Sequence, residues 1–254
     1  MTESGTTQQL KSFRILLIGD TCVDTYVYGN VNRISPEAPV PIFEPHSEII
    51  KDGMGGNVLN NLKNLGCTVE FLHGKVSQKK RLIDERSKQQ LLRIDNDSIS
   101  DPITFETAIP DFYDAIVISD YCKGTVSYEL VEEIIKEAKC PVFIDTKKHD
   151  LARFEGAIVK INAHEFSQLV STPSKQNLIV THGDKGVMWD GWAMSPDRVE
   201  VADVCGAGDT FLSALVYSYL DTSDMRTAIR FAIKAAGISV QHIGCYAPRL
   251  EEIV

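Results

Sequence analysis

Residues 13–19 read FRILLIG, and this apolar run ends at Gly19-Asp20. A short, continuous run of this kind is typical of a strand that is buried on both faces of a parallel sheet. Four further runs share the pattern: AIVIS (115–119), PVFID (141–145), GAIVKIN (156–162) and LIVT (178–181). The sequence therefore predicts a central sheet whose strands are mostly parallel.

Helical patterns lie between and after these runs. Segments 57–65 and 127–138 carry apolar residues at the 3.6-residue period, and 208–220 and 224–240 read as two more helices. Strands that alternate with helices indicate an α/β fold with right-handed crossovers. Because no repeat or low-complexity linker interrupts the pattern, we expect one domain over residues 13–254, after a polar tail over 1–12.

Two stretches break the alternation of strands and helices. Residues 26–50 contain four prolines among short β-prone pieces, and residues 79–95 contain strand-like pieces separated by polar residues. Neither resembles a central parallel strand. We expect them to form a small antiparallel flap over the main sheet, and a surface meander is the alternative that the pattern leaves open.

Composition and charge exclude several classes of protein. Of 254 residues, 43% are hydrophobic and 24% charged, which is typical of a globular chain, and the net charge of −9 argues against a general binder of nucleic acid or anionic membranes. The six cysteines form no C-x-x-C pair, so a structural zinc site is disfavoured. With no signal peptide and no apolar run long enough to cross a bilayer, we expect a soluble, cytoplasmic protein with free thiols.

Polar side chains gather where the predicted strands end. In open α/β sheets, ligands bind outside the carboxyl ends of the strands. One such residue is usually only a helix cap or a turn residue. Six of them at one edge favour a site there: Asp20, Asp24, Asp120, Asp145, Asn162 and Thr181.

The sharpest motif is DVCGAGDTF, at residues 203–211. Gly206, Ala207 and Gly208 precede an apolar helix, so backbone N–H groups and the helix N-terminus can together hold an anion. Asp209 in the first turn has two interpretations. It either stabilises the helix dipole or accepts the proton of a hydroxyl that attacks a phosphoryl group.

Other ligand motifs are absent or weak. There is no G-x-x-x-x-G-K-[ST] loop, no G-x-G-x-x-G after the first strand, no H-E-x-x-H and no G-x-S-x-G. A second glycine cluster, Gly53-Met54-Gly55-Gly56-Asn57, opens the helix at 57–65. It is either an ordinary flexible turn with an Asn cap or a turn whose amides bind sugar hydroxyls.

Together these motifs resemble the ribokinase-like (PfkB) carbohydrate kinases. DVCGAGDTF looks like the C-terminal signature of that family, and GMGGNVLNNLKNLG (53–66) looks like the N-terminal one. Within the family, the segments at 19–43, 89–95, 119–124 and 144–150 resemble the D-glycero-β-D-manno-heptose-7-phosphate kinases, the kinase half of bifunctional ADP-heptose synthesis proteins. The resemblance runs from about residue 13 to the C-terminus. It implies a three-layer α/β sandwich with a small β lid made by 26–50 and 79–95, which in relatives often mediates dimerisation.

The resemblance also implies a reaction, namely transfer of a phosphoryl group from ATP to the anomeric hydroxyl of a sugar phosphate, with Mg²⁺. Asp209 matches the catalytic base and Gly206, Ala207 and Gly208 match the anion hole. The positions that match nucleotide, magnesium and phosphate contacts are Asn162, Glu165, Thr181, Gly183 and Lys234. Asp203 and Gly244 lie where relatives often place a loop that holds K⁺. The sugar-contacting positions are Asp24, Gly55, Gly56 and Asn57, and the candidates for the sugar phosphate are Lys79, Arg81, Arg93 and Lys123.

This sequence departs from the family pattern at several points. Met54 replaces a glycine, and Lys234 stands where the closest relatives often have Asn near the adenine pocket. The chain is also a few tens of residues shorter than a typical relative, with peripheral helices missing near 71–81 and 171–180. Two alternatives therefore stay open: a kinase for another hexose, pentose or nucleoside, and a catalytically weak ligand-binding or assembly protein on the kinase fold.

Overall fold

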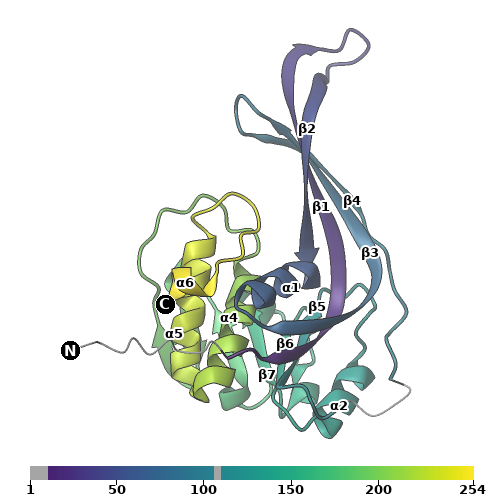
Figure 1. Cartoon of the computed structure of the whole chain (residues 1–254). Coiled ribbons are helices and arrows are strands. Elements are labelled where there is room, and N and C mark those ends of the chain that lie inside the picture. Colours follow the sequence, from purple (N-terminus) through teal and green to yellow (C-terminus); the bar gives the residue numbers. More distant parts are fainter. Residues whose placement is uncertain (1–10, 106–109) are drawn as a thin grey trace, which may run out of the picture.

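The computed structural model describes residues 11–105 and 110–254, so residues 1–10 of the expected polar tail lie outside the described part. A sheet flanked by helices forms the body of the molecule, and a long blade of strands rises from it (Figure 1). The strands that the structure describes are β1 (Arg14–Ile34), β2 (Pro41–Met54), β3 (Thr68–Asp84), β4 (Gln90–Asn96), β5 (Ala115–Asp120), β6 (Val142–Thr146), β7 (Ile158–Asn162), β8 (Leu178–Thr181), β9 (Val187–Trp189) and β10 (Trp192–Met194).

The central sheet has the strand order β10-β9-β8-β7-β6-β5-β1-β3-β4, and β2 pairs with the outer part of β1. Neighbours from β8 to β3 run parallel, whereas β9, β10, β2 and β4 each run antiparallel to their neighbours. All five apolar runs of the sequence form strands of this sheet. The prediction of an α/β fold with a mostly parallel sheet is therefore confirmed.

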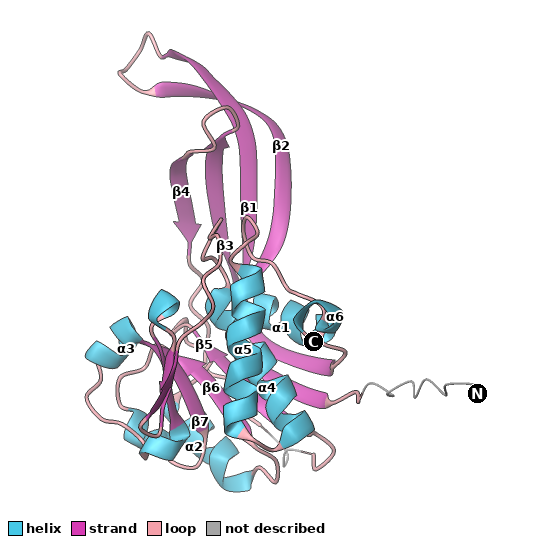
Figure 2. Ribbon diagram, turned by 90° about the vertical axis from the view of Figure 1, so that its left-hand side faces the viewer, coloured by secondary structure: helices cyan, strands magenta, loops and turns pink. Residues whose placement is uncertain are grey.

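Helices cover both faces of the sheet (Figure 2). They are α1 (Gly55–Asn64), α2 (Tyr128–Glu137), α3 (Ala163–Ser167), α4 (Ala207–Thr222), α5 (Met225–Ser239) and α6 (Leu250–Ile253). Alternate residues of β5 show why its sequence is apolar throughout. Ala115 and Val117 pack in the core formed with α1, α4 and α5, whereas Ile116 and Ile118 pack in the core formed with α2.

The blade is the lid, and its construction differs from our expectation. β1 and β3 are continuous strands whose first halves lie in the central sheet and whose second halves pair in parallel within the lid, from Thr21↔Val76 to Gly29↔Asp84. β2 and β4 flank this pair with antiparallel contacts. The lid therefore extends the central sheet outward (Figure 1). The antiparallel pairing expected for residues 26–50 and 79–95 is present within each stretch, as β1 with β2 and β3 with β4, and the surface meander is wrong. The parallel pairing of β1 with β3 was not expected, because pairing between two long strands is not visible in local periodicity.

The two expected gaps in the helical layers are present. Residues 71–81 form part of β3 without a helix, and residues 171–180 contain only a 3₁₀ turn at Lys175–Asn177 before β8. Among the residues that the structure describes, no helix is both long and apolar enough to cross a membrane.

Candidate active site

The loop before α4 brings Asp209 to the carboxyl edge of the sheet. Gly206 caps the helix in the left-handed region at φ 78°, which glycine adopts without strain. A Cβ atom on Gly206 would lie 2.6 Å from Nδ2 of Asn57, on α1. Only glycine therefore lets the two signature motifs of the sequence meet, and it places Asn57 beside Asp209.

Asp209 is buried and accepts two hydrogen bonds. Asn57 Nδ2 donates to Oδ2 at 2.8 Å, and the hydroxyl of Tyr121 donates to Oδ1 at 2.9 Å. Burial raises the pKa of Asp209 to about 6, against the effect of these donors. The nearby Asp145 raises this pKa as well, whereas Lys160 lowers it. The carboxylate is thus held in place and is a better base than an exposed aspartate, while it is still mostly ionised at pH 7.

Lys160 provides a buried positive charge beside the glycine loop. Its Nζ lies 2.6 Å from Asp145 Oδ2, and a Cβ atom on Gly208 would lie only 2.9 Å from the same Nζ. Burial lowers the pKa of Lys160, but the negative charges of Asp145, Asp209 and Glu165 outweigh this effect and the pKa is raised. The loop at 206–208 therefore faces an ammonium group in addition to its own amides, which is a favourable environment for a phosphoryl group.

These groups line one cavity of about 160 Å³ at the carboxyl ends of β5, β6 and β7. Asp209, Gly206 and Gly208 of the signature motif lie there together with Lys160. The other lining residues are Asp120, Tyr121, Asp145, Lys147, Asn162 and Glu165.

The NAHE segment at 162–165 forms a capping box at the start of α3. The side chain of Asn162 accepts a hydrogen bond from the backbone N–H of Glu165 at 2.9 Å, and Glu165 Oε2 accepts one from the N–H of Asn162 at 2.8 Å. This reciprocal pair fixes the carboxylate of Glu165 at the wall of the cavity.

The lining of this cavity fits a magnesium ion bound together with phosphates. Mg²⁺ in such sites is held by one or two carboxylates, waters and substrate oxygens. Glu165 and Asp145 both line the cavity and supply carboxylates of this kind. No group of three or more His, Cys, Asp or Glu side chains in the described ranges 11–105 and 110–254 is arranged to hold a metal without such help.

The expected nucleotide residues are only partly gathered. Thr181 ends β8 and pairs in register with Asn162 on β7, and Gly183 begins the 3₁₀ turn at Gly183–Lys185. These two positions therefore continue the sheet edge on which the cavity lies. Lys234 is exposed on α5 and is not part of the cavity lining.

The lid brings charged residues close to the site. Asp24 on β1 is buried and forms an ion pair with Arg81 of β3, with Nη1 at 2.5 Å from Oδ1. The thiol of Cys22 shows how near these groups are to the carboxylate of Asp209. Burial and Asp24 raise its pKa to about 11, Lys79 and Arg81 act in the opposite direction, and Asp209 adds to the rise.

The remaining expected sugar and phosphate contacts lie on the lid and at its base. Gly55 and Gly56 are the first residues of α1 and are buried. Lys79 lies opposite Asp24 in register, and Arg81 lies opposite Arg93 of β4. Residues at the same register point to the same face of a sheet, so these basic side chains share the face of Asp24. Lys123 lies on the loop after β5 and forms an ion pair with Asp97 at 2.6 Å.

Asp203 and Gly244 do come together, in a loop that also contacts the ammonium of Lys51. The N–H groups of Gly244 and Cys205 donate to the carboxylate of Asp203 at 2.9 and 3.0 Å. The neighbouring carbonyls of Ile243 and Cys245 accept hydrogen bonds from the ammonium of Lys51. A positive charge of the chain itself thus lies beside this loop.

Other strand-end carboxylates have a structural role. Asp20 accepts the N–H groups of Tyr121 and Lys123 at 2.8 and 3.0 Å, which shapes the loop after β5. Asp120 accepts the hydroxyl of Thr146 and forms a buried ion pair with Lys148 at 2.9 Å.

Sequence reasoning missed Tyr121, Lys160 and Lys51. Of these, only Lys160 carries a signal in the sequence, because it is a charge inside an otherwise apolar strand segment (IVKIN). Tyr121 and Lys51 reach their partners across 88 and 194 residues of sequence.

An aspartate, a glycine loop at a helix N-terminus and a lysine share one cavity at the edge of an α/β sheet. This combination of fold and site is typical of the α/β phosphotransferases. The model of the pfkB family carbohydrate kinases matches residues 51–253. This chain belongs to that family.

The chain is also similar in sequence to proteins with curated names. The bifunctional protein HldE of Nitratiruptor sp. is 31% identical over 298 residues, which covers 94% of this chain and 64% of that protein. HldE of Campylobacter jejuni is 30% identical over 295 residues, with the same coverage. The chain thus spans less than two thirds of the length of these relatives.

Solved structures share the fold. A ribokinase from Thermotoga maritima superposes with a TM-score of 0.68 at 16% identity, over 95% of this chain and 98% of that one. The Arabidopsis thaliana ribokinase, solved with ribose and ATP, gives a TM-score of 0.70 at 15% identity, over 96% and 98%. These likenesses establish the fold of the chain.

Proposed function

We propose that residues 13–254 act as one kinase domain that transfers the γ-phosphoryl group of ATP to the anomeric hydroxyl of a heptose 7-phosphate. The observation that carries this proposal is the shared cavity of Asp209, the glycine loop at 206–208 and Lys160. Transfer to a hydroxyl requires a base and an anion-binding surface that face one small space.

Asp209 accepts the proton of the sugar hydroxyl as that oxygen attacks phosphorus. The hydrogen bonds from Asn57 and Tyr121 fix the carboxylate in the wall of the cavity. Positioning matters more than basicity here, because the loose transition state of phosphoryl transfer needs little proton removal before the P–O bond breaks.

Lys160 and the amides of residues 206–208 offset the charge on the transferred group. Because Lys160 is held by Asp145 and buried, its ammonium is already oriented before the substrate binds. Glu165 and Asp145 would hold Mg²⁺, which supplies further charge neutralisation on the phosphates. Asn162, Thr181 and Gly183 would contact the nucleotide along the same sheet edge, with Lys234 at its periphery.

The lid supports the choice of a phosphorylated sugar. Arg81 and Arg93 lie directly opposite each other on β3 and β4, and two like charges in this arrangement need negative charges beside them. Each is paired with one aspartate, Arg93 with Asp95 at 2.9 Å. Since a guanidinium has five N–H donors, each arginine keeps donors for a phosphate. Lys79 and Lys123 are the other candidates for this contact, and Asp24, Gly55, Gly56 and Asn57 would contact the sugar ring.

The experiment measures ADP release with Mg²⁺-ATP and a panel of acceptors: heptose 7-phosphate, unphosphorylated heptose, ribose, a hexose phosphate and a nucleoside. We expect the highest kcat/KM for the heptose phosphate. Arg93→Gln should raise KM for this substrate by about 10-fold or more, the weight of a charged hydrogen bond, and leave unphosphorylated sugars unaffected. Arg86→Gln, in the turn between β3 and β4, is the matched control.

A preference for another acceptor would replace the heptose by that sugar or nucleoside. ATP binding by calorimetry without ADP release would instead indicate a catalytically weak binding protein. The curated relatives are bifunctional HldE proteins, which favours the heptose phosphate among these outcomes.

We also propose that the chain forms a homodimer through the lid. Ile50, Leu92 and Ile94 are 62%, 52% and 49% exposed. Their register with Thr25 and Leu82 places them on the lid face opposite Asp24 and Arg81. An apolar face of this kind favours contact with a second copy, which would leave the sugar face open.

A further inference from the structure

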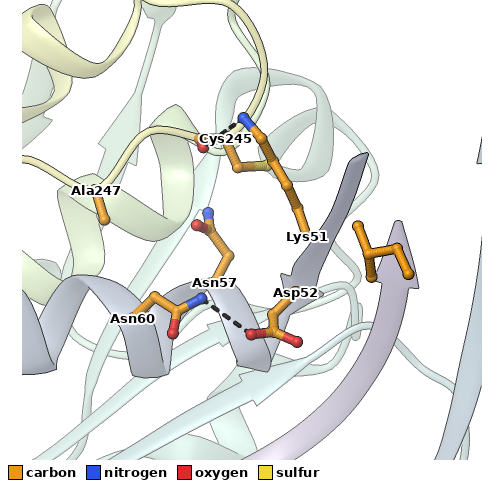
Figure 3. A pocket seen from close by; sticks show the side chains of 7 residues that line it. Lys51, Asp52, Asn57, Asn60, Cys245 and Ala247 are labelled. Carbon is orange, nitrogen blue, oxygen red and sulfur yellow. Dashed lines mark hydrogen bonds between the residues drawn. The ribbon is translucent and has the colours of Figure 1, made fainter. Parts of the chain in front are cut away.

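Lys51 connects the base of the lid with the C-terminal loop. It lies near the end of β2, and its Nζ donates hydrogen bonds to the backbone oxygens of Cys245 at 3.2 Å and Ile243 at 3.4 Å. Figure 3 shows this side chain reaching Cys245 above a cavity of about 300 Å³ that Lys51 lines together with Asp52, Asn57 and Asn60.

The surroundings of this ammonium resemble those of a bound cation. The ring of Tyr26 lies 5.8 Å from Nζ, and a Cβ atom on Gly244 would lie 2.8 Å from it. Asp24, the cross-strand neighbour of Lys51, is engaged by Arg81. Backbone carbonyls are the ligands that replace the hydration shell of K⁺ in proteins, and here two of them, those of Ile243 and Cys245, accept hydrogen bonds from Nζ.

This loop also contacts the anion hole. The Sγ atoms of Cys245 and Cys205 are 3.7 Å apart, and a Cβ atom on Gly206 would lie 3.1 Å from Sγ of Cys245. Asp203 accepts the N–H groups of both Gly244 and Cys205. Residues 243–245 therefore pack directly against residues 205–206 and share Asp203 as a hydrogen-bond acceptor.

We propose that the Lys51 ammonium replaces a free monovalent cation in this protein. It holds the 243–245 loop against the anion hole, so that neither folding nor phosphoryl transfer requires K⁺. Lys51 is then a positioning residue, which acts through the loop on Gly206. The part that concerns catalysis rests on the proposed kinase function, whereas the part that concerns the ion does not.

The decisive measurement is thermal melting in KCl, NaCl and choline chloride at equal ionic strength. The wild-type Tm should be the same in all three salts. Lys51→Met keeps the length of the stem and removes the charge, so its Tm should fall by about 3–6 °C in choline chloride and recover in KCl. Lys136→Met, at an exposed lysine in the last turn of α2 and away from the lid, is the matched control and should show no salt dependence.

Activity gives a second readout. Wild-type kcat should not change when choline replaces K⁺, whereas Lys51→Met should be stimulated at least tenfold by K⁺. Lys51→Arg keeps the charge, so its kcat should not depend on K⁺. This variant replaces Lys51→Met in the experiment if the methionine variant does not fold. A wild-type Tm that rises specifically with K⁺, or a Lys51→Met variant without any response to K⁺, would overturn the proposal. Because melting needs no substrate, a failure of the kinase assay would not decide this question.

Discussion

Asp209 combines two requirements that oppose each other. The site needs an ionised carboxylate, and burial disfavours that form and raises its pKa to about 6, from 3.8. In the unfolded chain the side chain of Asp209 loses its proton near pH 4, whereas in the folded protein it keeps the proton up to about pH 6. Between about pH 4 and 6 the folded state therefore binds more protons than the unfolded state. The free energy of unfolding therefore falls as pH rises through this window, and the penalty is fully present above pH 6.

Asp209→Asn tests both sides of this conflict. We expect kcat to fall by about 10²–10⁴-fold, the usual weight of a general base. At pH 8 the variant should melt at the same or a higher temperature than wild type, because a charge whose burial costs up to about 3 kcal/mol is removed. This advantage should shrink as pH falls toward 4, as differential scanning calorimetry can measure.

The pH profile of the wild-type enzyme is the control for this interpretation. Its kcat/KM should decline below about pH 6, where Asp209 becomes protonated. An unchanged rate in Asp209→Asn would contradict the role of Asp209 as the base. A strongly lowered Tm of this variant at pH 8 would contradict the cost assigned to burying its charge.

Met54 is a second residue whose conformation matters. It precedes α1 at φ 55°, in a region that non-glycine residues rarely adopt, and its side chain is buried. The chain thus accepts backbone strain of about 1–3 kcal/mol at the entrance to α1 in exchange for burial of a large apolar side chain.

At the scale of elements, the residues of the capping box at the start of α3 both stabilise the helix and contribute a carboxylate to the cavity. Asn162 and Glu165 satisfy each other's backbone N–H groups, and Glu165 also lines the cavity. Substitutions can separate these parts, because glutamine can still accept the capping bond through its oxygen while it loses the charge.

Glu165→Gln should leave Tm within about 1 °C of wild type and lower kcat with a raised Mg²⁺ requirement, as measured by titration of MgCl₂ in the ADP-release assay. Asn162→Ala is the matched variant. It removes the side chain that caps α3 and should destabilise the protein by about 0.5–2 kcal/mol. If both variants lost stability alike, Glu165 would have only a capping role.

At the scale of the whole molecule, the lid is an extension of the central sheet. β1 runs from the buried core to the far end of the lid, and β3 follows beside it as far as the level of Gly29 (Figure 1). This frame carries charges on one face and apolar side chains on the other.

Ile94→Asp should therefore weaken self-association without affecting the fold. We expect sedimentation velocity to show dimers for wild type and mostly monomers for the variant, since a charge is placed in an apolar contact. Val170→Asp, at an apolar residue that is 82% exposed and outside the lid, is the control. A wild-type chain that is monomeric at about 100 µM, in the range of weak contacts, would rule out the lid dimer.

The sequence by itself determined the layers of this protein and the two motifs that meet at its site. Buried parallel strands need apolar residues on both faces, so runs such as 13–19 and 115–119 are visible locally. Gly206 and Asp209 are visible because a helix N-terminus that holds an anion needs small residues in front of it.

Only the tertiary structure decided how distant segments pair. The lid was expected as an antiparallel flap because strand pairing between β1 and β3 leaves no local period. Tyr121 and Lys51 gave no sequence signal either, since a tyrosine or lysine on a loop or edge strand is ordinarily a surface residue. Their functions arise from contacts across 88 and 194 residues, and such contacts exist only once the sheet edge, the lid and the C-terminal loop have come together.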